Sequence, residues 1–91
     1  MVIDKNLCPV CGFTLNFAPL DDNAPPYEIC PCCGIQFDYT DAADDLEGRK
    51  KLHEEYREWW ISQGMKWWSK GRPAPPNWDP KEQLRRIGIF L

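Results

Sequence analysis

Cysteines are the residues of this chain best suited to chemistry, and four of the five form two matching pairs. Residues 8–12 read CPVCG and residues 30–34 read CPCCG. Thiolates in the pattern C-x2-C-x18-C-x2-C have the spacing of a tetrahedral metal site, for which zinc is the usual ion. We therefore predict that one Zn²⁺ ion per chain is bound by Cys8, Cys11, Cys30 and Cys33.

The two cysteine motifs belong to an internal repeat with an offset of 22 residues. CPVCGFTLNF at 8–17 matches CPCCGIQFDY at 30–39, and the match aligns Cys33, rather than Cys32, with Cys11. A Gly follows each pair and allows the positive φ that such a turn needs. Alternating apolar residues after each Gly predict a short half-buried strand. Cys32 is either a reactive thiol or, as we favour because the turn has no basic residue, a small turn side chain.

The second half of the chain predicts helices and an aromatic cluster. One helix is expected at about 46–63 and another at about 80–87, with Asp79 as N-cap of the second. The five tryptophans could form a binding surface or a small core, and we expect about three of them to be buried. Trp67 or Trp68, between the helices, is the candidate for an exposed contact with a partner.

The remaining polar residues suggest no catalytic set. His53 is the only histidine, lies among charges and is expected to be a solvated surface side chain. Asp41, Asp44 and Asp45 are possible caps of the first helix within a solvated cluster. They are not expected to form a calcium site, because the glycine and glutamate positions of a calcium loop are missing. There is no Ser/His/Asp triad and no phosphate-binding glycine loop, so we predict that the protein is not an enzyme.

The charge pattern and the apolar pattern limit the possible partners and the compartment. Residues 1–48 hold one Lys and nine acidic side chains, a net of −8, and residues 49–91 hold ten basic and five acidic ones, a net of +5. The total of −3 disfavours nucleic acid as a partner, although Lys66, Lys70 and Arg72 are interleaved with tryptophans. No signal peptide or membrane-spanning run is evident, so we expect a cytoplasmic protein without a membrane partner.

CPVCG and CPCCG together resemble the two knuckles of a zinc ribbon, a fold group that includes the rubredoxin-like proteins. The stretch YEICPCCGIQF also resembles small bacterial proteins of the cysteine-rich CPCC type. The first resemblance implies a metal-binding ribbon over roughly residues 5–40, and the second implies an immunity or regulatory role. A rubredoxin-like protein would hold iron in the same thiolate site and carry electrons, and ribbons of transcription and translation proteins imply nucleic-acid binding.

We therefore expect one small α+β domain over residues 1–91. A zinc ribbon of short antiparallel strands, at about 1–40, would pack against a Trp-rich helical extension at about 41–91. The expected function is a non-enzymatic, zinc-stabilised module that binds another protein. An iron electron carrier and a nucleic-acid-binding ribbon are the alternatives, and the oligomeric state is left open.

Overall fold

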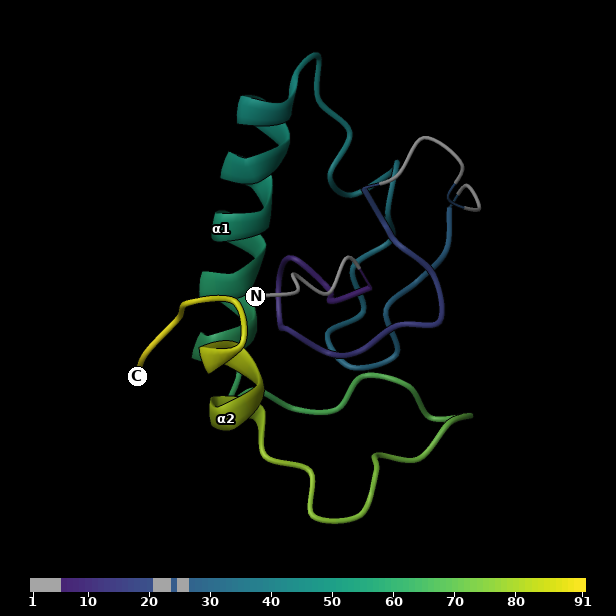
Figure 1. Cartoon of the computed structure of the whole chain (residues 1–91), viewed down its shortest axis with the longest axis vertical. Helices are drawn as coiled ribbons and strands as arrows, with labels where there is room; N and C mark the ends of the chain where they lie inside the picture. The colour runs from purple at the N-terminus through teal and green to yellow at the C-terminus, as the bar shows by residue number, and fades with distance from the viewer. Residues whose placement is uncertain (1–5, 21–23, 25–26) are drawn as a thin grey trace.

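The two cysteine motifs lie in loops beside two helices in the computed structural model, which describes residues 6–20, 24 and 27–91. Figure 1 shows the longer helix, α1, along one side of the molecule and the cysteine loops on the other. The predicted ribbon module of residues 1–40 also includes residues that lie outside the described part, namely 1–5, 21–23 and 25–26. Among the described residues, no helix is both long enough and apolar enough to cross a membrane.

The helix boundaries follow from their capping residues. Helix α1 spans Leu46–Ser62, where a helix at about 46–63 was expected, and the Asp45 side chain accepts the Gly48 N–H at 2.7 Å. Helix α2 spans Pro80–Arg85, where about 80–87 was expected. Its N-cap is Asp79, as predicted, and this carboxylate accepts two backbone N–H groups of the first turn. Each cap satisfies helix N–H donors that have no partner within the helix.

The hydrophobic core is built mainly from the two copies of the repeat. Ten of the twelve buried apolar residues in the described chain form five pairs with an offset of 22 residues. The pairs are Cys8 with Cys30, Val10 with Cys32, Cys11 with Cys33, Phe13 with Ile35, and Leu15 with Phe37. The other two are Trp60 of α1 and Leu84 of α2. The helices therefore cover a core that the cysteine motifs provide.

No β-sheet forms within the described residues, so the prediction of a ribbon of short antiparallel strands is wrong. Each motif closes with one isolated antiparallel bridge, Leu7 with Thr14 and Ile29 with Gln36. The backbone hydrogen bonds in these motifs close each turn on itself, as in the bond from the Cys8 N–H to the Phe13 carbonyl. A pair of strands this short has little stability on its own. The alternating apolar side chains after each cysteine pair are buried in one cluster with the cysteines instead.

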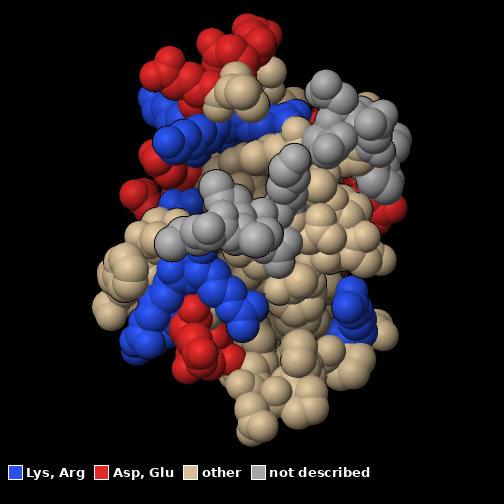
Figure 2. Space-filling view, viewed as in Figure 1, with Lys and Arg blue, Asp and Glu red and all other residues tan. Residues whose placement is uncertain are grey.

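Contacts between the halves partly offset the charge asymmetry of the sequence. Arg49 of α1 donates to the Asp38 carboxylate at 2.9 Å, and its Nε lies 3.7 Å from Asp41. Figure 2 shows Lys and Arg side chains lying next to Asp and Glu side chains over α1 and around it. The acidic cysteine half and the basic helical half thus attract each other within one chain, which favours their packing.

Candidate metal centre

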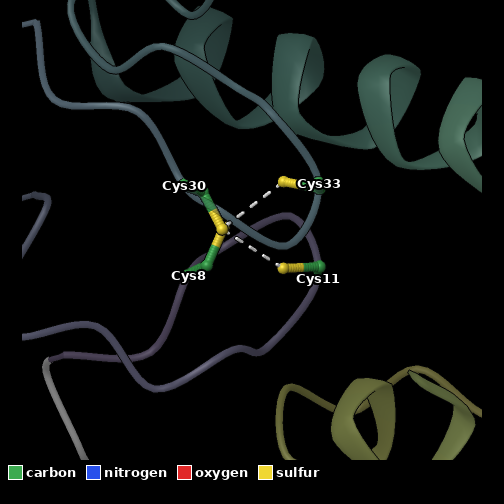
Figure 3. A group of neighbouring side chains, drawn as sticks. All are labelled: Cys8, Cys11, Cys30 and Cys33. Carbon is green, nitrogen blue, oxygen red and sulfur yellow. Dashed lines mark hydrogen bonds between the residues drawn. The ribbon is translucent and has the colours of Figure 1, made fainter. Parts of the chain in front are cut away.

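The sulfur atoms of the four predicted ligands lie together in the interior, all within 4.8 Å of one another. Figure 3 shows them pointing from two loops toward a common centre. Across the loops, the Sγ atoms of Cys8 and Cys33 are 3.9 Å apart and those of Cys11 and Cys30 are 3.7 Å apart. A tetrahedron of sulfurs around zinc has edges of about 3.8 Å, whereas a disulfide bond is about 2.05 Å long. This geometry fits a metal ion.

The electrostatics of the cluster also fit a cation. Burial raises the pKa of the Cys11 and Cys33 thiols, because a charged sulfur loses its hydration there. Hydrogen bonds from Cys11 and its neighbouring thiols lower the pKa of Cys30. Only a cation at the centre would compensate four buried negative charges.

The carbonyl groups of the first cysteine turn are bonded by side chains from the helices. Arg57 of α1 donates from Nε to the Val10 carbonyl at 2.8 Å and from a terminal nitrogen to the Pro9 carbonyl at 2.7 Å. Gln83 of α2 donates from Nε2 to the Cys11 carbonyl at 2.9 Å. Three successive carbonyls of this turn are therefore satisfied by residues far along the chain.

The second cysteine turn has its matching carbonyls bonded in the same way, by different donors. These bonds, each 2.9 Å long, run from the Ser69 N–H to Pro31, from the Trp68 N–H to Cys32 and from the Tyr56 hydroxyl to Cys33. Burial, with the neighbouring sulfurs, raises the pKa of Tyr56 to about 12, so the hydroxyl keeps its proton at neutral pH. The second half of the chain is thus a polar shell around both turns, and it holds their backbones in place.

Cys32 occupies the place that Val10 has in the first copy of the repeat. Both side chains are fully buried, so Cys32 belongs to the core, although the sequence predicted only a small side chain of the turn. Its sulfur is not a member of the four-sulfur group, and Gln83 Nε2 lies 3.2 Å from it. A buried cysteine of this kind behaves as a small apolar residue with a weak acceptor.

A buried polar cluster beside α1 was missed by the sequence reasoning. His53 was expected to be solvated, but it is 4% exposed and its Nε2 lies 2.7 Å from Asp41 Oδ2. Asp41 was expected to be a possible helix cap, but it is fully buried and its Oδ1 accepts the Asp38 N–H at 2.7 Å. The signal available in the sequence was the spacing of Arg49 and His53, which places two possible partners of a carboxylate on one helix face.

Replacing Asp41 by Ala should destabilise the protein by about 2–3 kcal/mol, because the buried His53 and the backbone N–H of Asp38 lose a charged acceptor. Burial alone would raise the pKa of Asp41, but bonds from His53 and the Asp38 N–H and the Arg49 charge hold it below its usual value. The stabilisation is therefore complete above the usual pKa of about 3.9 and is lost as the pH falls through the lower folded value.

Denaturant unfolding of the metal-loaded wild type and the Asp41→Ala variant checks this prediction, at neutral pH and at each lower pH at which both proteins keep their metal. Asp44→Ala is the matched control, because Asp44 is an exposed carboxylate of the same segment. Equal stabilities of the three proteins at neutral pH would contradict the assigned role of Asp41.

The tryptophans divide into structural and exposed ones. Trp60 is buried, and Trp67 and Trp78 are partly buried, in edge-to-face contact with each other. Trp68, one of the two candidates for a partner contact, is 50% exposed. Trp59 is 52% exposed, although its neighbour Trp60 on the same helix is only 2% exposed and faces the core. Trp59 is therefore an exposed aromatic residue that the helical pattern did not identify.

Comparisons of this chain with protein-family models, with curated proteins and with solved structures gave no match. What defines the protein is therefore its own geometry: two repeated cysteine turns, covered by two helices, around four buried sulfurs. This is the arrangement of a small module that a bound metal ion could stabilise.

Proposed function

We propose that the four cysteines bind one zinc ion and that the protein is a non-enzymatic interaction module whose fold depends on that ion. The observation that carries this proposal is the group of four buried sulfurs at tetrahedral spacing. Bound zinc would supply a cross-link between the two turns. A site with four thiolate ligands keeps no open position for water or substrate, which favours a structural role over a catalytic one.

The surroundings of the sulfurs support a structural role for the metal. Each of the four cysteines is at most 1% exposed. The carbonyls of both turns are bonded by residues from the helical half, so folding of that half and assembly of the sulfur group depend on each other. A rubredoxin-like iron centre with the same ligands would carry electrons, and metal analysis distinguishes this alternative from zinc.

The first experiment is to measure metal content and the visible spectrum of protein purified from cells supplied with both iron and zinc. We expect one zinc ion per chain and a colourless protein. A red protein with one iron ion per chain would favour the electron carrier. Protein that is folded and free of metal would overturn the ligand assignment.

An interaction role is supported by the two tryptophans that the fold leaves about half exposed, Trp59 and Trp68. Large exposed aromatic side chains are enriched where proteins bind partners. The resemblance to CPCC-type proteins adds an immunity or regulatory role to this proposal. In either role the module would act by binding another protein.

A further inference from the structure

The end of α1 and the segment that follows it enclose a hollow of about 260 Å³ at the surface. Its exposed lining consists of Trp59, Gln63, Lys66 and Trp68, with Cys33 of the second turn also in the lining. The two exposed indoles of the molecule therefore belong to one site. The metal-binding turn contributes to the same site.

The indole N–H groups separate these two tryptophans from the other three. Trp60 donates to the Lys66 carbonyl at 3.0 Å, Trp67 to the Arg72 carbonyl at 2.6 Å and Trp78 to Gln83 Oε1 at 3.1 Å. In the described part of the chain, the indole N–H groups of Trp59 and Trp68 have no acceptor. Buried tryptophans use this donor internally, and a free donor beside an exposed ring is available to a ligand.

Both exposed indoles are held by the second cysteine turn. The backbone N–H of Trp68 donates to the Cys32 carbonyl, and the Trp68 ring packs on Gly34, where a Cβ atom would lie 2.4 Å from the ring. Trp59 packs against Tyr56 with ring centroids 5.3 Å apart, and Tyr56 bonds the Cys33 carbonyl. The rings therefore have set positions before any ligand arrives, which lowers the entropic cost of binding.

The chemistry of the hollow is that of flat apolar faces with hydrogen-bond donors. The lining contains Trp59 and Trp68, whose indole N–H groups have no acceptor among the described residues, together with Lys66 and Gln63, and it contains no carboxylate. A polyproline II segment is complementary: its proline residues have no N–H, its backbone carbonyls are free, and its rings pack on aromatic faces. We propose that this hollow binds a proline-rich segment of a partner protein, an inference that rests on the proposed role as an interaction module.

Two other ligand classes fit the hollow less well. A cationic group would meet the Lys66 ammonium and no carboxylate to compensate it. A single nucleic-acid strand would stack on the indoles, but it would also approach a chain with a net charge of −3. The proline-rich segment needs neither a negative nor a positive surface around the rings.

The test measures fluorescence anisotropy of a labelled oligoproline of about ten residues during titration with the metal-loaded full chain. We expect saturable binding that Trp68→Ala and Trp59→Ala each weaken by at least about tenfold. Trp59→Phe keeps a ring face but loses the donor, so it should weaken binding by about fivefold. Tyr39→Ala is the matched control: Tyr39 is an exposed aromatic outside the hollow and should not affect binding.

Metal content and far-UV circular dichroism of every variant are measured on the same samples. Folded, zinc-loaded protein that does not bind oligoproline would overturn this inference and leave the structural zinc site standing. Stronger binding of a labelled oligothymidine than of oligoproline, or an equal loss in Tyr39→Ala, would also overturn it. Tryptophan-dependent oligoproline binding by a metal-free chain would support the inference and overturn the dependence on zinc.

Discussion

Replacing Cys33 by Ser is expected to leave the chain without metal and unfolded, whereas replacing Cys32 by Ser, one position away, should preserve both metal and fold. A serine hydroxyl stays protonated at neutral pH and is a poor ligand for zinc. The apparent binding energy of a structural zinc site is on the order of 10 kcal/mol, comparable with the whole stability of a small domain. The rest of the core cannot replace this energy, because ten of the twelve buried apolar residues in the described part of the chain belong to the two cysteine motifs.

The Cys32→Ser variant is a sharp control because both cysteines are buried in the same turn. Its hydroxyl can still accept from Gln83 Nε2, which lies 3.2 Å from the Cys32 sulfur, so we expect a loss of only about 1 kcal/mol. Metal content per chain and far-UV circular dichroism check both variants, and a chelator added to the wild type should reproduce the Cys33→Ser spectrum. A folded Cys33→Ser protein with a full complement of metal would contradict the ligand assignment.

Replacing Gly12 by Ala should cost at least about 4 kcal/mol, a loss of the size reserved for severe backbone or packing conflicts. Gly12 has φ +81°, and a Cβ atom there would lie 2.2 Å from the Gln83 carbonyl oxygen and 3.0 Å from its carbon. Both atoms are backbone atoms of α2, so no side-chain rotation relieves the overlap. The helix would have to move away from the first cysteine turn, and the bond from Gln83 to the Cys11 carbonyl would be lost with it.

Gly88→Ala separates the packing conflict from the conformational cost. Gly88 has φ +82°, almost the same as Gly12, but a Cβ atom there would have no heavy atom within 4 Å. It should therefore cost only the backbone strain of about 1–2 kcal/mol. Denaturant unfolding at a fixed free zinc concentration measures both variants, because bound metal shifts apparent stability. Equal losses for the two would show that α2 is free to move away from the first turn.

The four-sulfur group could be predicted from residues 8–12 and 30–34, because a Cys-x2-Cys turn is a local structure. Its cysteine spacing and its following glycine are adjacent in the sequence, and the repeat distinguished Cys33 from Cys32. The N-cap at Asp79 was predictable for the same reason, since a cap bonds N–H groups two or three residues away. The predicted strands were wrong because alternating apolar residues indicate which side chains are buried, and not whether a neighbouring strand exists.

The sequence by itself determined the sulfur set and the N-cap of α2, both of which are local patterns. Only the tertiary structure decided what surrounds the sulfurs. Gln83 reaches the Cys11 carbonyl across 72 residues, Arg57 reaches Val10 across 47, and His53 meets Asp41 across 12. Such contacts depend on how two helices pack over two turns. The spacing of residues along the sequence does not predict that packing. For the same reason, the sequence did not show which tryptophans use their indole N–H internally. In the described structure Trp60, Trp67 and Trp78 do so, and Trp59 and Trp68 do not.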